Sequence, residues 1–182
     1  MKQVIIGLAI LLLGSTTVFS QHKYRADKGF VSFFSSAPLE DIYAENKTVI
    51  SLVDLVKREI AFVVTIADFQ FEKSLMQEHF NEKYMESHKY PKATFEGTIS
   101  SPDELKEPGT YTVTVTGELT IHGVTKTVEV EGTIMVGESE VVASSEFKVK
   151  LEDYKVKVPR LVVRNIAEEV QVKVRLTYYP VQ

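Results

Sequence analysis

Cysteine is absent from the 182 residues of the chain. Its absence excludes lipid attachment to an N-terminal cysteine, catalysis by a cysteine nucleophile and metal sites built from thiolates. It does not identify a compartment, because an exported protein of this size folds without disulfides when its core is large enough.

A surplus of positive charge is lacking as well. The 21 Lys and Arg residues stand against 25 Asp and Glu residues, which gives a net charge of −4. Because a nucleic-acid backbone is bound by a clustered basic surface, this mildly acidic balance argues against nucleic acid as a partner.

The apolar run at positions 4–13 is interrupted only by Gly7 and is much shorter than the roughly 20 residues of a membrane-spanning helix. Lys2 supplies the positive charge that precedes the apolar part of a signal peptide. Val18 and Ser20 occupy the two positions that signal peptidase reads. The pattern predicts an exported protein rather than one with a membrane anchor.

Cleavage is expected before Gln21, so that residues 1–20 are a cleaved signal peptide and residues 21–182 form one domain. Loss of Lys2 takes the net charge from −4 to −5. No glycine- and serine-rich linker divides the remaining chain. The mature protein is expected to be soluble, periplasmic or extracellular, and not membrane-spanning.

Catalytic motifs are missing too. The sequence contains no Gly-x-Ser-x-Gly elbow, no phosphate-binding glycine loop and no His-Glu-x-x-His pair. His79, Glu82 and Glu86 have a spacing that one helix face would bring together around a metal, but a solvated charged face is the simpler interpretation. We therefore expect a protein that is not an enzyme and holds no cofactor or metal.

Alternation of apolar and polar residues dominates the chain from Lys28 onward, and it is typical of strands with one buried face. One polar face indicates antiparallel pairing. About eight such strands suffice for a barrel that closes and has no free edge. The expected strands are a Phe-rich opening strand around Phe30 and Phe34, then residues 41–54, 60–66, 93–100, 111–121, 124–134, 141–151 and 170–178.

The alternation stops at residues 72–87. Ser74 and Gln77 have the spacing of a capping box, in which each side chain bonds the backbone of the other. Leu75, Phe80 and Tyr84 recur at helical spacing, which predicts a short amphipathic helix. A helix inserted between barrel strands is expected to cover one end of the barrel.

His122 and Gly123 separate two alternating runs and predict a tight hairpin turn. Gly123 permits the positive φ that such a turn needs, and His122 can bond nearby backbone. Alternatively, His122 contacts the polar head of a ligand at the barrel mouth. The turn chemistry favours the structural role.

The inward faces of the strands explain folding first, since each buried Val, Leu, Ile or Phe contributes about 1.5–3 kcal/mol. Eight strands are also enough to hold one ligand, and alternation alone leaves a solid and a hollow interior open. If the interior is hollow, the ligand contacts its inward residues, with His122 as a polar residue at the mouth. The residues expected inside are Phe30, Phe34, Ile60, Phe62, Val64, Ile66, Leu75, Phe80, Phe95, Tyr111, Val113, Val115, Leu119, Val128, Val130, Phe147, Val172 and Val174.

Residues 116–126, Thr-Gly-Glu-Leu-Thr-Ile-His-Gly-Val-Thr-Lys, resemble the hairpin of the YceI-like proteins, which typically reads G-x-L-T-I-H-G-V-T-K. Residues 89–95, Lys-Tyr-Pro-Lys-Ala-Thr-Phe, resemble the family's K-Y-P-x-I/A-x-F at the start of a central strand. Residues 75–80 resemble the family's short helix. The resemblance covers most of the mature chain and is strongest over residues 69–133.

The resemblance implies an extended, lipocalin-like, eight-stranded antiparallel β-barrel, exported to the periplasm, with a long hydrophobic tunnel. Characterised relatives bind polyisoprenoid chains, isoprenoid-quinone-like molecules or related amphiphiles, and the family brings no catalytic residues. This chain departs from the family pattern at residues 35–42, where a G-x-F turn is usual, and at residues 72–80, where R-D-x-H-L is common. The Arg-Asp pair is absent, so no role of that pair is carried over.

The favoured hypothesis is an exported lipid-binding protein that carries or stores an isoprenoid or another long-chain amphiphile. The alternative is a non-catalytic structural or interaction barrel with a solid core. An enzyme that uses His79 or His122 ranks third. The residues leave the physiological ligand and the oligomeric state open, a homodimer included.

Overall fold

The computed structural model describes residues 22–36, 41–157 and 168–181. The expected signal peptide, residues 1–20, and its cleavage site lie outside the described residues. Within the described ranges, no helix combines the length and apolar character needed to cross a bilayer.

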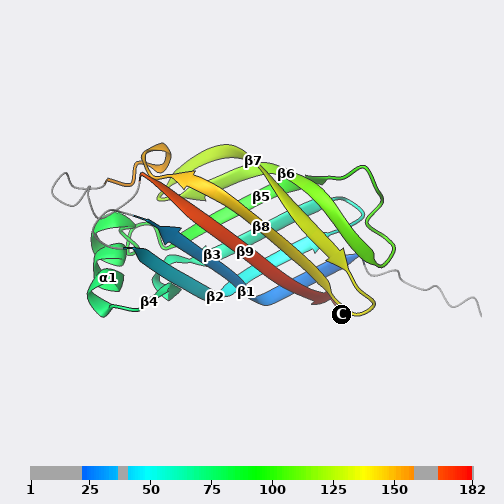
Figure 1. Ribbon diagram of the computed structural model, residues 1–182, viewed down its shortest axis with the longest axis horizontal. Helices are drawn as coiled ribbons and strands as arrows, with labels where there is room; N and C mark the ends of the chain where they lie inside the picture. The colour runs from blue at the N-terminus through cyan, green and yellow to red at the C-terminus, as the bar shows by residue number, and fades with distance from the viewer. Residues whose placement is uncertain (1–21, 37–40, 158–167, 182) are drawn as a thin grey trace, which may run out of the picture.

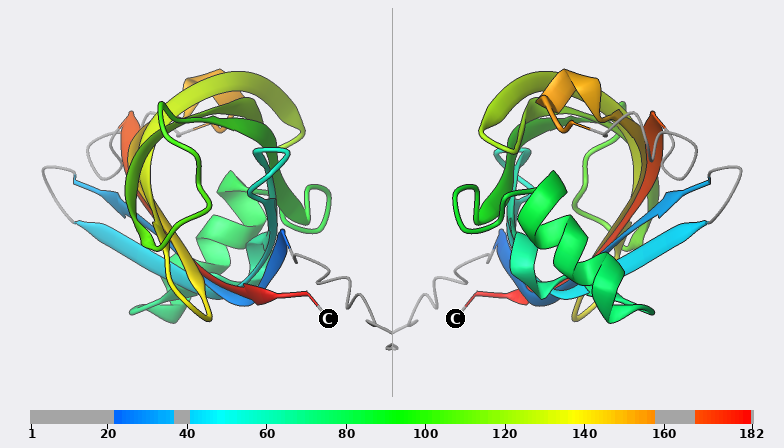
Figure 2. Two further views of the ribbon diagram at one scale, coloured as in Figure 1. Left: turned by 90° about the vertical axis from the view of Figure 1, so that its right-hand side faces the viewer. Right: turned by 90° about the vertical axis from the view of Figure 1, so that its left-hand side faces the viewer.

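Eight long strands form a closed antiparallel barrel (Figure 1), as the alternation predicted. Around the barrel the strands follow the order β1-β9-β8-β7-β6-β5-β3-β2, and β2 pairs again with β1 to close the ring (Figure 2). The bounds are β1 (Lys23–Ser35), β2 (Ile42–Asp54), β3 (Glu59–Thr65), β5 (Lys92–Ser100), β6 (Gly109–Ile121), β7 (Val124–Val136), β8 (Val141–Lys150) and β9 (Glu169–Pro180).

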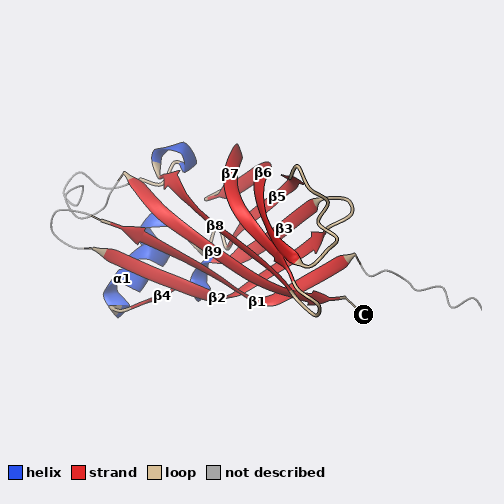
Figure 3. Cartoon of the chain, turned by 45° about the vertical axis from the view of Figure 1, so that its right-hand side comes forward, coloured by secondary structure: helices blue, strands red, loops and turns tan. Residues whose placement is uncertain are grey.

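Short elements lie at one end of the barrel. The two-residue strand β4 (Gln70–Phe71) pairs with β2, and the helix α1 (Ser74–His79) continues into a π-helical turn at Phe80–Tyr84. The helical segment lies across this end of the barrel (Figures 2 and 3), as the sequence predicted. A 3-10 turn, Glu152–Tyr154, follows β8.

The predicted capping box does not form. Lys73 is the N-cap residue of α1, Ser74 is already the first helical residue, and no side chain caps the helix. The Gln77 side chain instead accepts a hydrogen bond from the backbone N–H of Phe71, at 3.3 Å. Gln77 therefore joins the helix to β4 instead of closing the first turn.

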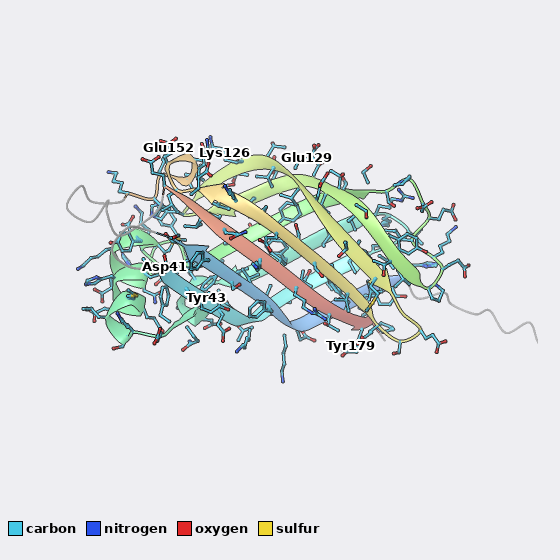
Figure 4. All side chains as sticks on the ribbon, viewed as in Figure 1. Asp41, Tyr43, Lys126, Glu129, Glu152 and Tyr179 are labelled. Atoms are coloured by element: carbon cyan, nitrogen blue, oxygen red, sulfur yellow. The ribbon has the colours of Figure 1, made fainter. Side chains whose placement is uncertain are left out.

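The β6–β7 hairpin has the predicted turn. His122 has a φ of 51° and Gly123 a φ of 72°, the pair of positive values that a two-residue type I′ turn requires. Ile121 pairs directly with Val124, so the two strands keep one register along their whole length. Polar residues of β7, such as Lys126 and Glu129, lie on the outside of the barrel (Figure 4).

The end of the barrel opposite α1 is packed solid. Ala26 and Val49 are fully buried there. Tyr178 has 0% exposure, and its hydroxyl lies 2.8 Å from the Ser51 Oγ. Since the Ser51 hydroxyl donates to the Ala61 carbonyl at 2.7 Å, the Tyr178 hydroxyl is the donor to Ser51. This end therefore buries its polar groups as satisfied pairs.

Candidate functional site

A cavity of about 580 Å³ occupies the α1 end of the barrel interior. Strands from opposite sides of the barrel supply most of its wall, through side chains such as Val64 of β3 and Val149 of β8. Helix α1 supplies Leu75, which is 59% exposed and still borders the cavity. The cavity therefore opens to solvent beside α1.

Four phenylalanines join the helical segment to the barrel. The Phe80 ring lies 5.5 Å from Phe33, 5.5 Å from Phe69 and 5.0 Å from Phe71, measured between ring centroids. Aromatic pairs at such distances stabilise by about 0.5–1.5 kcal/mol beyond their buried area. All four rings border the cavity, so the same contacts that hold the helical segment also shape the wall.

Polar side chains are few in this wall. They are Ser35, Lys73, His79 and the phenols of Tyr84 and Tyr154, and no carboxylate borders the cavity among the described residues. Burial raises the pKa of Tyr84 and Tyr154 above the usual value, so both phenols are neutral at physiological pH. The wall can enclose an apolar chain with a small polar head, but it offers no paired acid and base.

A second void of about 60 Å³ lies deeper in the barrel. It is bordered by Ile60, Phe95 and Val113, and by Val128 and Val130 of β7. Ile134 and Leu176 also border this void, and the solid end with Tyr178 lies beyond it. The barrel interior is thus hollow at the α1 end and filled at the other, which answers the question that alternation left open.

The structure divides the predicted interior residues into three groups, and their contact with a ligand stays a prediction. One group borders the main cavity: Phe62, Val64, Ile66, Leu75, Phe80, Leu119, Phe147, Val172 and Val174. A second group borders only the deeper void: Ile60, Phe95, Val113, Val115, Val128 and Val130. The third group, which borders neither, is Phe30, Phe34 and Tyr111.

The interior assignments of Phe30 and Phe34 are wrong. The inward residues of β1 are Gly29, Val31, Phe33 and Ser35, and Phe34 is 37% exposed on the outside. A Cβ on Gly29 would lie 2.3 Å from the Leu176 side chain, so this glycine faces inward. The register of β1 shifts on both sides of Gly29, and both faces of the strand carry aromatics, so alternation could not select the inner one.

Tyr111 lies on the inner face of β6 but beyond both voids. Its hydroxyl donates to the Glu107 carbonyl at 2.7 Å, and its ring packs against the core of the solid end. Tyr111 therefore fills the barrel rather than bordering the cavity.

Several wall residues were not predicted. Val149, Leu151 and Val170 continue alternating runs that were recognised, so the signal for them was present. No comparable signal existed for the residues that surround the helical segment, because alternation stops there. These are Phe69, Phe71 and Met85.

His122 fastens the hairpin tip to two neighbouring segments. Its Nε2 lies 2.9 Å from the Glu86 carboxylate and its Nδ1 lies 3.3 Å from the Tyr154 carbonyl, while its ring packs on Tyr90 at 4.4 Å between centroids. Both partners are acceptors, so both bonds form together when the imidazole carries two protons. The bond to His122 is the main cause that lowers the pKa of the Glu86 carboxyl.

His122 does not border the cavity, although Tyr154 and Met85, the residue before Glu86, both do. The geometry therefore gives His122 the structural role that the turn chemistry favoured. His79 borders the cavity while Glu86 bonds His122, so the His79, Glu82 and Glu86 spacing does not converge on a metal. Across the described residues, no group of three His, Cys, Asp or Glu side chains could hold a metal ion.

The model of the YceI-like domain family matches residues 27–178 of the sequence. A search of curated proteins finds no significant match. Solved structures with the same barrel do match over most of the chain.

Three of these solved structures illustrate the likeness. A polyisoprenoid binding domain from Saccharophagus degradans, implicated in plant cell wall breakdown, has a TM-score of 0.75 at 16% identity, over 88% of this chain and 99% of that chain. BcnA from Burkholderia cenocepacia has a TM-score of 0.68 at 23% identity, over 82% of this chain and 95% of that chain. The YceI protein of Campylobacter jejuni has a TM-score of 0.58 at 17% identity, over 100% of both chains. At these identities the likeness establishes the fold.

Proposed function

Since this chain belongs to the YceI-like domain family and has an apolar cavity at one end of its barrel, we propose that it binds an isoprenoid-like or other long apolar chain. We propose further that it is exported and acts as a carrier or store for this lipid. One of its structural relatives is described as a polyisoprenoid binding domain, which supports this choice of ligand class.

The observation that carries the proposal is the cavity itself. Its volume of about 580 Å³ falls within the range of small-molecule sites, roughly 300–1,000 Å³. Its wall is built from aliphatic and aromatic side chains, and transfer of apolar surface out of water gains about 25 cal/mol per Å². An apolar chain in this cavity would be stabilised along its length without any specific polar contact.

The few polar wall groups indicate how such a ligand would be oriented. Lys73 is the N-cap residue of α1 and His79 is its last residue, and both lie at the end where the cavity opens. An apolar tail would extend away from them into the barrel. A polar head would remain beside α1, at the end where the cavity is open to water.

Export rests on the sequence pattern of residues 1–20, with Lys2, the apolar run and the cleavage site before Gln21. The periplasmic or extracellular location follows from that pattern. It is tested by determining the N-terminus of the protein recovered from the periplasm or medium. An intact N-terminus in a cytoplasmic fraction would contradict it.

Blocking the cavity tests the proposed binding. Ala93 borders the cavity at the start of β5, and Ala93→Phe would place a ring in the space of the ligand. We expect this variant to bind farnesol at least about tenfold more weakly than the natural chain, because the ring displaces buried ligand carbons worth about 0.8 kcal/mol each. Isothermal titration calorimetry would measure both affinities.

The matched control is Thr98→Phe on the same strand, where Thr98 is exposed on the outer face. It should bind farnesol as the natural chain does. Equal affinities of all three proteins would place the ligand outside the cavity. Native mass spectrometry of the natively purified protein adds a direct readout, and a consistently empty barrel would instead favour a structural or interaction role.

A further inference from the structure

Four side chains separate the main cavity from the deeper void. Phe62, Leu119, Phe147 and Val174 border both spaces, whereas the other wall residues border only one. They come from β3, β6, β8 and β9. We call these four residues the floor of the cavity.

The floor spans the barrel from side to side. In the strand order around the ring, β3 and β8 lie opposite each other, so Phe62 and Phe147 approach the interior from opposite walls. Leu119 projects from β6, midway between β3 and β8 in the ring, and Val174 projects from β9. Two aromatic rings and two branched side chains therefore close the inner end of the main cavity.

The floor is supported from below. The Phe62 ring stacks on Phe95, with centroids 5.2 Å apart and planes at 18°. Phe95 in turn covers the cross-strand glycine pair Gly97 and Gly117, where an added Cβ would come within 2.7 Å and 2.8 Å of the Phe95 ring. The ring of Phe95 thus occupies the space that the two glycines leave open, and it holds Phe62 at its level.

From this geometry we propose that Phe62, Leu119, Phe147 and Val174 set the longest apolar chain that the protein can bury. The inference rests on the proposed binding function. A chain that reaches the floor gains affinity with each carbon inside, about fourfold per methylene. Carbons beyond that length stay in water at the α1 end and add no affinity.

A series of prenyl alcohols tests the proposal, since geraniol, farnesol and geranylgeraniol grow by one isoprene unit at a time. Their affinities for each protein would be measured by calorimetry, and the alcohol beyond which affinity stops rising defines the length limit. Phe147→Ala removes a ring from the floor and joins the two voids. We expect its limit to move to a longer alcohol, with at least about tenfold higher affinity for that alcohol than the natural chain has.

Val174→Phe tests the opposite direction, because a larger side chain raises the floor. Its limit should move to a shorter alcohol. Ile134→Ala is the control for Phe147→Ala: it enlarges the deeper void at a residue that borders only that void and is not part of the floor, so the limit should stay unchanged. Thermal unfolding of each variant identifies any that do not fold, and Phe147→Leu replaces Phe147→Ala in that event.

The outcomes separate the two proposals. If the natural chain binds none of the alcohols, the proposed function fails and the length limit fails with it. If the natural chain binds them but Phe147→Ala and Val174→Phe keep its limit, only the floor is overturned. A shift in Ile134→Ala as large as that in Phe147→Ala would also overturn it, since the deeper void would then be accessible without opening the floor.

Discussion

Tyr178 shows how a single buried polar residue is satisfied in the solid end of the barrel. Its hydroxyl donates a hydrogen bond to the Ser51 hydroxyl, which in turn donates one to the Ala61 carbonyl. Alternation placed Tyr178 on an inward face but could not identify these partners, because Ser51 is 127 residues away in sequence. The hydrogen bond is a consequence of barrel closure, which brings β2 and β9 to neighbouring positions beside β1.

Burial raises the pKa of Tyr178 far above that of a free tyrosine, about 10. A raised folded-state pKa stabilises the fold fully below the unfolded pKa, and this contribution is lost as pH rises from about 10 toward the folded value. Tyr178→Phe should lower the free energy of unfolding by about 1 kcal/mol at neutral pH through the lost hydrogen bond.

Free tyrosine ionises between about pH 9 and pH 11. Over this range the free energy of unfolding of Tyr178→Phe should fall less than that of the natural chain, because the variant has no phenol at this position. Urea unfolding at several pH values measures both effects. An identical alkaline loss in the two proteins would mean that Tyr178 is not the group whose ionisation is suppressed.

The conformation of His122 follows from its near neighbours in sequence, whereas its hydrogen-bond partners depend on the tertiary structure. Its turn conformation was predictable, since Gly123 follows it and strands flank the pair. Its partners were not, because Glu86 and Tyr154 lie 36 and 32 residues away in sequence. Three segments meet at this residue only once the barrel and the helical segment are both in place.

At the scale of elements, strand β1 shows where alternation fails. Phe33 and Phe34 are adjacent, yet Phe33 borders the cavity and packs on Phe69, Phe71 and Phe80, while Phe34 is exposed beside Tyr43 of β2. Successive side chains of a strand point to opposite faces, so one shift of register exchanges the two. The irregularity around Gly29 provides that shift.

A matched pair of substitutions checks the assignment. Phe33→Ser should lower the free energy of unfolding by about 3 kcal/mol or more, because a partly buried aromatic that packs on three other rings is lost and a hydroxyl takes its place. Phe34→Ser should change it by about 1 kcal/mol or less, since its ring is already partly in water. Chemical denaturation of both variants measures the difference, and a larger loss for Phe34→Ser would reverse the inner face of β1.

The helical segment is the other element for which sequence and structure differ. Leu75, Phe80 and Tyr84, whose spacing predicted the helix, all border the cavity. The helix nevertheless begins without a capping box, and Gln77 bonds Phe71 instead. Helix-start signals describe local bonds, and here a tertiary bond to β4 replaces one of them.

For the whole molecule, the division into a hollow and a solid half has a consequence for stability. Leu176 is 1% exposed and borders only the small deeper void, whereas Leu119 in the floor is 4% exposed and borders both voids. A side chain beside a void has fewer contacts to lose when it is shortened. The solid half should therefore carry more of the stability per side chain.

Leucine-to-alanine substitutions in the two halves test this. Leu176→Ala should cost about 4 kcal/mol of unfolding free energy and Leu119→Ala about 2–3 kcal/mol, at the two ends of the usual range for buried leucines. Thermal and urea unfolding of the ligand-free proteins would measure both. An equal cost would contradict the prediction, because it would mean that Leu119 loses as much packing as Leu176 when it is shortened.

The sequence by itself determined the strands, the hairpin at His122 and Gly123, the helical insert and the antiparallel pairing. Each follows from contacts between near neighbours or from a period of two that one chain segment displays on its own. The resemblance of residues 116–126 and 89–95 indicated the family, which the match over residues 27–178 then established.

Only the tertiary structure decided whether the barrel is hollow, and where. The same inward rows of Val, Ile and Phe fill one half, where Tyr178 meets Ser51, and border a cavity in the other, where Phe80 and its neighbours cover the end. Alternation states which side chains face inward. How much space they leave depends on how far apart the opposite walls stand, and that distance is set by closure of the whole ring.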